Sequence, residues 1–341
     1  MSPTTTQPQA PPPPKLDYAP AGASLRSFLA RLTSFREFMI LLIIATAWIY
    51  MKFASDVFAT PDYQLSLLLS VSVEVIVAIG MTILLVSGGF DLSVGSTVAF
   101  TGAVAAYCLT QYSMPVPLAI LASLASGAAI GLCNGLIVAK LNINPFITTL
   151  GTMGIVRGAL EVLTKGQNIT GLPQSFKSIG QDNLFGIIQY PIVIAIVLII
   201  LGDILLRKSR FFRQNYYIGG NEKAARLSGI PVNALKIFNY ALIGFLAAIA
   251  GIVNTARLGN ASVTAAQGLE LKVITAVIIG GASLQGGEGT ILGAFLGSFL
   301  MAIIVGALPL LDVPIYYNKL VIGATLLLAV LIDTLGKRRR T

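Results

Sequence analysis

Side chains that could carry out chemistry are few in this sequence and stand far apart. Histidine is absent, which removes the commonest proton shuttle near neutral pH and the commonest nitrogen ligand for metals. The two cysteines, Cys108 and Cys133, lie inside apolar segments, where packing is a better interpretation than a disulfide. No serine–histidine pair, paired aspartates or metal-ligand spacing occurs. We therefore expect no catalytic site, no cofactor and no metal in this chain.

A nucleotide site is also missing. The phosphate-binding pattern G-x-x-x-x-G-K-[ST] does not occur, and the Gly336-Lys337 pair runs into Arg338. The glycine-rich stretch Gly280–Gly289 has no lysine for a phosphate, so it is more typical of a turn between two helices. Any step that consumes ATP must be carried out by another chain.

Charged residues inside apolar stretches need a partner or a function. Glu74 stands midway along such a stretch, where an uncompensated charge costs about 2.5–3.5 kcal/mol. It should face the interior of a helix bundle, either as a structural hydrogen-bonding group or as part of a polar pathway. Arg157 and Glu161 are four residues apart and could pair on one helical face. Asp91 stands at the edge of an apolar run, where a turn or cap role is favoured.

The composition explains why these charges stand out. The chain has 341 residues, of which 55% are hydrophobic and 11% are charged, whereas soluble domains average about 25% charged residues. Apolar stretches of about 18 residues or more follow one another, and each is long enough to cross a bilayer as a helix. The sequence therefore predicts an all-α polytopic membrane protein. Its net charge of +9 is distributed as on a membrane protein, so we expect no nucleic-acid partner.

Ten transmembrane spans are predicted. The eighth is short and ends at Gly280-Gly281, so it could be a broken or re-entrant helix. The spans lie near Phe38–Phe53, Leu65–Val86, Leu92–Leu109, Val116–Ala139, Phe146–Leu163, Pro191–Leu206, Ile237–Ala256, Leu271–Leu284, Ile291–Leu308 and Leu320–Leu335.

Composition also divides the chain into a tail, a membrane domain and a second tail. Residues 1–35 are rich in proline and predict a disordered N-terminal tail, residues 36–336 the membrane domain, and residues 337–341 a basic tail. With ten spans and both termini cytoplasmic, sixteen of the 23 Lys and Arg residues fall on the cytoplasmic side, as the positive-inside rule requires. Residues 165–189 then form an outer loop with about one turn of helix.

The largest cytoplasmic segment, residues 207–236, is polar and basic, and we call it the basic loop. Within it, Asn221 is a good N-cap, Glu222 favours a first helical turn, and Gly229 followed by Pro231 ends the helix. The pattern predicts a helix of about two turns. It could seat in a groove on a cytoplasmic partner, or it could be an incidental helix in a positively charged loop; composition leaves both readings open.

Four motifs in order resemble one family. GGFDLSVGS (Gly88–Ser96), NPFITTLGT (Asn144–Thr152), IGGNEKAARLSGI (Ile218–Ile230) and IGGASLQGGEGT (Ile279–Thr290) are similar to those of ribose-type permease subunits of ABC importers. The resemblance covers roughly Phe38 to Leu335. It implies a bacterial inner-membrane permease that moves a monosaccharide. The implied partners are a cytoplasmic ATPase subunit, a periplasmic sugar-binding protein and a second permease copy or paralogue.

The resemblance also assigns roles to residues. The helix near Asn221–Gly229 corresponds to the coupling helix that contacts the ATPase, and its contact candidates are Asn221, Glu222, Ala224, Ala225, Arg226 and Gly229. The motif and turn positions are Asp91, Gly95, Gly286 and Gly287. The pattern G-G-x-x-L-x-x-G occurs at both 88–95 and 280–287, which leaves an internal duplication open.

A sugar pathway needs hydrogen-bonding groups that do not bind strongly. The residues of suitable chemistry and depth are Glu74, Asn134, Asn144, Thr148, Thr149 and Asn254, although serine and threonine in membrane helices often bond to their own backbone. Three rival functions stay open. They are an ABC permease for amino acids or nucleosides, an ion-coupled secondary transporter, and an intramembrane enzyme, for which the sequence offers little chemistry.

Overall fold

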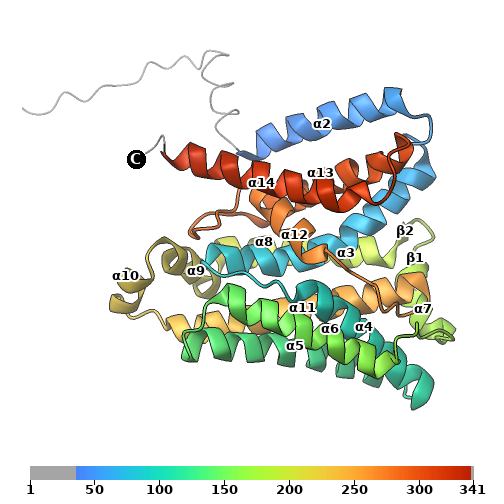
Figure 1. Cartoon of the computed structure of the whole chain (residues 1–341), viewed down its shortest axis with the longest axis horizontal. Helices are drawn as coiled ribbons and strands as arrows, with labels where there is room; N and C mark the ends of the chain where they lie inside the picture. Colours follow the sequence, from blue (N-terminus) through green and yellow to red (C-terminus); the bar gives the residue numbers. More distant parts are fainter. Residues whose placement is uncertain (1–35, 339–341) are drawn as a thin grey trace, which may run out of the picture. The chain divides into compact units, whose positions relative to one another are not determined.

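The computed structural model describes residues 36–338; the predicted N-terminal tail and the last three residues lie outside the described residues. Most of the described chain is helical (Figure 1). The helices are α2 (Arg36–Ala54), α3 (Pro61–Val86), α4 (Val94–Gln111), α5 (Val116–Lys140), α6 (Pro145–Thr164), α7 (Gln174–Gln181), α8 (Tyr190–Lys208), α9 (Arg210–Gly220), α10 (Glu222–Leu227), α11 (Val232–Leu258), α12 (Leu269–Ile279), α13 (Ile291–Leu310) and α14 (Tyr317–Arg338).

The prediction of an all-α polytopic protein is confirmed, since each of the ten predicted spans contains one helix. Within residues 36–338, eight helices are long and apolar enough to cross a membrane. The two others at predicted spans are α4 and α12. Helix α12 has 11 residues and is about 16 Å long, roughly half the hydrocarbon thickness. The eighth predicted span is therefore a short helix followed by a glycine-rich connection to α13.

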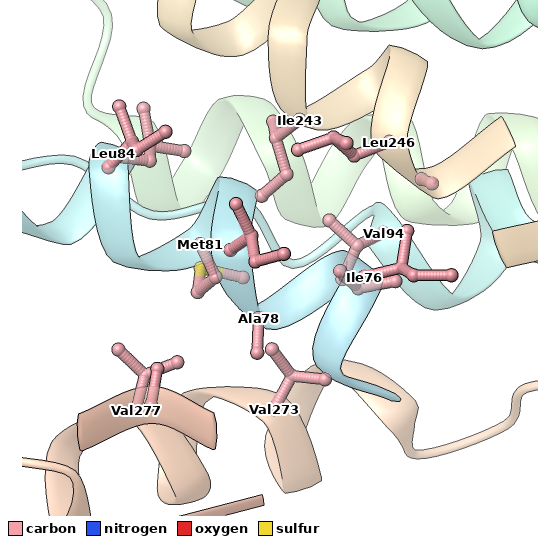
Figure 2. Close-up of a cluster of buried hydrophobic side chains, with 14 of the residues drawn as sticks. Ile76, Ala78, Met81, Leu84, Val94, Ile243, Leu246, Val273 and Val277 are labelled. Carbon is pink, nitrogen blue, oxygen red and sulfur yellow. The ribbon is translucent and has the colours of Figure 1, made fainter. Parts of the chain in front are cut away.

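Helix α3 is the centre of the bundle, and from Val71 to Val86 its side chains are all buried. Figure 2 shows how its two sides are covered: Ile243 and Leu246 of α11 lie on one side, and Val273 and Val277 of α12 on the other. A helix that is apolar all round is expected to be surrounded by other helices. Its burial makes α3 the helix against which α11 and α12 pack from two sides.

Helices α5 and α11 pack backbone to backbone. Gly127, Gly131 and Gly135 recur every four residues on the α5 face that meets α11. A Cβ atom added at Gly131 would clash with the carbonyl oxygen of Tyr240. Small residues at this spacing let membrane helices approach closely and gain van der Waals contact. The seam holds α11 firmly against the bundle.

The two polar segments of the chain, the basic loop and residues 165–189, lie at opposite ends of α11. This helix has 27 residues and is about 40 Å long. The α9–α10 segment precedes its first residue, Val232, and residues 165–189 pack near its last turn, where Gln181 donates a hydrogen bond of 3.1 Å to the Arg257 carbonyl. The latter segment contains α7 and a small antiparallel pair, β1 (Asn183–Leu184) and β2 (Ile188–Gln189). The predicted turn of helix there is thus a helix of eight residues.

Candidate functional site

The basic loop folds into two short helices, α9 and α10, rather than one. Asn221 has an extended backbone between them, and its side-chain oxygen accepts a hydrogen bond of 3.0 Å from the Ala224 amide. This is the N-cap that the sequence predicts. Gly229 follows α10 with a φ of 81°, a left-handed conformation that glycine adopts without strain. The predicted start and stop of α10 are therefore confirmed, while α9 had not been predicted.

Glu222 holds α10 in place through two ion pairs. Its Oε1 atom lies 2.9 Å from Nη2 of Arg226 in the same helix, and its Oε2 atom lies 2.7 Å from Nζ of Lys236 in α11. Arg226 also donates a hydrogen bond of 2.8 Å to Asn233. Partial burial acts to raise the pKa of Glu222, but its hydrogen bonds and the charges of Lys236 and Arg226 outweigh that effect and lower the pKa below its ordinary value. Glu222 is thus a carboxylate at neutral pH.

The two faces of α10 differ. On the inner face, Ala225 is buried and packs with Ile218, Val232 and Leu235. On the outer face, Leu227 is 91% exposed. A hollow of about 530 Å³ is lined by residues of α9 and α10, among them Tyr217 and Ala224. A large apolar side chain exposed on a capped and anchored helix is available for contact with a partner surface.

The structure presents most of the predicted contact residues outward. Asn221, Ala224, Arg226 and Gly229 are exposed, and Glu222 is partly exposed. The exception is Ala225, whose side chain faces the bundle and anchors the helix. Leu227 was not among the predicted residues. Its signal in the sequence is an isolated leucine next to polar residues and followed by Ser-Gly.

Glu74 has its counter-charge within the bundle. Its carboxylate forms an ion pair with Lys272 of α12, a residue that the sequence analysis did not single out. The two side chains are 10% and 14% exposed. Lys272 also lines a cavity of about 190 Å³ with Tyr63, Ser66 and other residues of α3 and α13. The ion pair therefore joins the central helix α3 to the short helix α12.

Asp91 is the centre of a buried hydrogen-bond network. Its Oδ1 atom accepts from the Ser93 amide at 2.7 Å and from the Ser93 hydroxyl at 2.6 Å. Its Oδ2 atom accepts from Asn134 of α5 at 3.2 Å, and Thr152 of α6 donates to Asn134 at 2.6 Å. The network ties the α3–α4 connection to α5 and α6, which agrees with a turn role for Asp91. Asn134, a predicted pathway residue, is fully buried within it.

Three of the other predicted pathway residues lie at the start of α6, and the fourth lies in α11. Asn144 caps α6 by accepting from the Phe146 amide at 2.8 Å, and Thr149 donates to the carbonyl of Pro145 in its own helix. Thr148 has a buried hydroxyl for which the described residues supply no hydrogen-bond partner. Asn254 in α11 is partly buried. The lining role of these residues stays a prediction.

Arg157 is held by backbone groups. Its Nη1 atom donates hydrogen bonds of 3.1 and 3.0 Å to the carbonyls of Val263 and Ala265, in the connection between α11 and α12. The charges of Glu270 and Glu161 also act on Arg157, so the predicted pairing with Glu161 is present as a charge interaction, while the described hydrogen bonds go to the loop carbonyls. The loop carbonyls lie within reach of the long arginine side chain, so tertiary packing decides its partner. Among residues 36–338, no three His, Cys, Asp or Glu side chains come together as a metal site would require.

Comparison with known proteins adds a family to this geometry. Residues 63–330, which include α3 to α13, the basic loop and the Glu74–Lys272 pair, match the model described as "Branched-chain amino acid transport system / permease component". The chain belongs to this permease family. It is a multi-pass inner-membrane component of a transport system and not an enzyme.

Individual relatives match most of the permease. It is 42% identical to the ribose import permease protein RbsC of Escherichia coli K12. The 282 compared residues cover 81% of this chain and 87% of the relative. It is 40% identical over 278 residues to the Bacillus subtilis protein of the same name, covering 81% and 86%. It is 38% identical over 283 residues to the L-arabinose ABC transporter permease protein AraH of Azospirillum brasilense, covering 83% of each. The resemblance drawn from the four motifs is confirmed.

Proposed function

We propose that this permease is the membrane-spanning subunit of an ATP-driven importer for a monosaccharide. The observation that carries the proposal is the agreement of two independent features. One is the identity of 38–42% with ribose and arabinose permeases over at least 81% of the chain. The other is a short, anchored helix, α10, that exposes Leu227.

The solute class follows from the relatives rather than from the family description, which names branched-chain amino acids. Ribose, arabinose and xylose permeases all match this chain. A neutral sugar needs hydrogen-bonding groups but no fixed counter-charges. This suits a bundle whose deepest charged pair, Glu74 with Lys272, already neutralises itself.

The basic loop supports a cytoplasmic ATPase partner. Lys and Arg residues gather in the N-terminal tail, in residues 207–236 and at the C-terminus, which favours a cytoplasmic position for all three. An ATPase subunit would then dock on the outer face of α10, and ATP would be bound and hydrolysed by that subunit. The opposite end, with α7 and the β1–β2 hairpin, would receive the sugar-binding protein.

A second permease chain would complete the pathway. Gly151, Gly154 and Gly158 of α6 are exposed, and a Cβ atom added at any of them would meet no atom within 4 Å. Exposed glycines at this spacing allow another membrane helix to approach closely. In the assembled importer, ATP binding would draw the ATPase subunits together, move α10, and switch the pathway between its outward-open and inward-open states.

The test of the solute class is uptake by cells that lack this permease and by the same cells complemented with it. Radiolabelled D-ribose, L-arabinose, D-xylose and L-leucine would be supplied separately. We expect uptake of at least one of the sugars to be lost and restored, with leucine uptake unchanged. Loss of leucine uptake with intact sugar uptake would overturn the sugar assignment and favour an amino acid permease.

The test of the energy source uses right-side-out membrane vesicles that contain the complemented system. Sugar uptake should require enclosed ATP and persist when a protonophore collapses the proton gradient. Uptake without ATP, driven by an ion gradient, would instead identify a secondary transporter.

In the same vesicles, the double variant Glu222→Ala/Arg226→Ala should remain in the membrane but lose sugar uptake, because α10 loses both of its ion pairs.

A further inference from the structure

Three segments of the permease meet at one glycine, Gly219, near the end of α9. A Cβ atom added there would clash with the carbonyl oxygen of Val86, at the end of α3, and with the backbone nitrogen of Gly287, in the α12–α13 connection. It would also lie 3.0 Å from the Cα atom of Gly286. The φ angle of Gly219 is not in the left-handed region. Glycine is therefore required at this position for space and not for backbone conformation.

The repeated G-G-x-x-L-x-x-G pattern supplies the other side of this contact. Gly286 and Gly287, from the second copy, have φ angles of 88° and 77°, and the Gly287 amide donates a hydrogen bond of 2.9 Å to Val86. In the first copy, a Cβ atom added at Gly88 would lie 3.9 Å from the Cα atom of Gly219. Both copies thus converge on the same residue. We call Val86, Gly219, Gly286 and Gly287 the glycine junction.

Two side-chain contacts hold α9 against the same elements. The Tyr216 hydroxyl donates a hydrogen bond of 2.7 Å to the Gly289 carbonyl in the α12–α13 connection. The buried Asn239 of α11 donates to Asn215 of α9 at 2.8 Å and to the Ser87 hydroxyl at 3.3 Å. Helix α9 is therefore bonded to the α12–α13 connection and, through Asn239, to the end of α3.

We propose that Gly219 is a positioning residue through which movement of α10 is passed to α3, α12 and α13. This inference rests on the proposed function, in which α10 is displaced by an ATPase partner. Gly219 is two residues before Asn221, the cap of α10. At the junction, backbone touches backbone, so no flexible side chain lies between the elements to absorb a displacement. Close-packed interfaces of this kind shift between discrete arrangements as units.

The junction also explains which helices would move. Val86 is the last residue of α3, the buried centre of the bundle, and Gly287 lies between α12 and α13. Helix α12 is short and is joined to α3 by the Glu74–Lys272 pair. A displacement of Gly219 would thus act on α3 at Val86 and on the α12–α13 connection at Gly287. These elements are joined to one another by the Glu74–Lys272 pair.

The experiment compares Gly219→Ala with Gly220→Ala in the purified importer, reconstituted in proteoliposomes with its ATPase and binding protein. Gly220 is the matched control because a Cβ atom added there meets no atom within 4 Å and its φ angle is also outside the left-handed region. The readouts are ATPase co-purification, ATP hydrolysis, and D-ribose taken up per ATP hydrolysed. For G219A we expect retained ATPase binding and a ratio of uptake to hydrolysis at least about tenfold below that of G220A. An equal ratio in the two variants would overturn the proposal.

A second variant keeps the test decisive if G219A fails to assemble. Tyr216→Phe removes the hydrogen bond to Gly289 without adding an atom, and it should lower the uptake-to-hydrolysis ratio about two- to threefold while the ATPase stays bound. If the uptake-to-hydrolysis ratio of this variant equals that of the unmodified permease, the proposed role of the glycine junction is overturned. If the unmodified permease binds no ATPase, or if ATP does not drive its uptake, the proposed function itself fails, and this outcome is distinct from an unchanged ratio in the variants.

Discussion

Within residues 36–338, the Glu74–Lys272 and Glu222–Lys236 ion pairs differ in burial. Glu74 and Lys272 join α3 to α12 with side chains 10% and 14% exposed. Glu222 and Lys236 join α10 to α11 with side chains 41% and 22% exposed. The chemical groups are the same, and water reaches one pair far more than the other.

Solvent access changes what each pair contributes. Removing one partner of a buried pair leaves an uncompensated charge and costs about 3–5 kcal/mol, whereas an exposed pair contributes roughly 0.2–1 kcal/mol. The inner pair therefore fixes α12 on the central helix. The outer pair orients α10 but contributes little to the free energy of unfolding. The same chemistry therefore contributes strongly to stability in one region and weakly in the other.

The largest expected effect comes from breaking the inner pair. Lys272→Met should lower the free energy of unfolding by about 3–5 kcal/mol, because the buried Glu74 carboxylate loses its ion-pair partner. Thermal unfolding of the detergent-solubilised permease would measure the loss. The control is the double variant Glu74→Gln/Lys272→Met, which should recover most of the stability since no buried charge remains. Equal melting temperatures for K272M and the native permease would contradict the structural role of the pair.

Asp91 tests a buried carboxylate whose described contacts are hydrogen bonds rather than an ion pair. Asp91→Asn should cost about 1–3 kcal/mol, because an amide NH₂ group would then face the NH₂ group of Asn134. The swap Asp91→Asn/Asn134→Asp restores a donor opposite an acceptor and should regain part of the loss in the same unfolding assay. No difference between the single variant and the swap would show that the network does not contribute as described.

Leu227 separates docking from folding in the outer region. Leu227→Ser should leave the melting temperature unchanged because the side chain is 91% exposed. It should weaken ATPase association about tenfold, or roughly 1.4 kcal/mol, as measured by binding of the ATPase to the permease in nanodiscs. Phe185→Ser is the matched control, since Phe185 is 90% exposed in the hairpin connection at the other end of α11. Equal association of both variants would argue against α10 as the docking element.

The smallest effect is expected for the outer ion pair and depends on pH. The pKa of Glu222 is lowered in the folded state, so its stabilisation is present above the unfolded-state pKa of about 4.3 and is lost as pH falls through the folded pKa. Glu222→Gln should therefore reduce stability by roughly 0.2–1 kcal/mol at pH 7. Melting curves of both proteins from pH 7 downward should converge in acid. A difference that widened on acidification would have the wrong sign.

Much of this molecule followed from local sequence. The apolar stretches predicted the ten helices at the spans, because lipid cannot satisfy a bare backbone and forces each stretch to bond internally. The cap at Asn221 and the stop at Gly229 could also be predicted, because both depend on residues within a few positions of the helix ends. The family was recognisable from motif order.

The partners of buried groups could not be read in this way. Lys272 stands 198 residues from Glu74, and Arg157 donates its described hydrogen bonds to carbonyls more than a hundred residues away, although the charge of Glu161 in its own helix also acts on it. Helix packing decides such contacts, and one sequence contains no periodic signal for them. Asn134 illustrates the consequence: its polarity suggested a pathway, and only the structure shows its hydrogen bond to Asp91, while its pathway role stays a prediction.

The sequence by itself thus determined the membrane class, the helices at the ten spans, the ends of α10 and the family, because these depend on composition and on short-range backbone chemistry. Only the tertiary structure decided which charges neutralise each other, which face of α10 is exposed, and why Gly219 must be glycine. These depend on distances between segments far apart in the chain. The two copies of G-G-x-x-L-x-x-G were visible in the sequence, but their meeting at Gly219 is a property of the packed bundle.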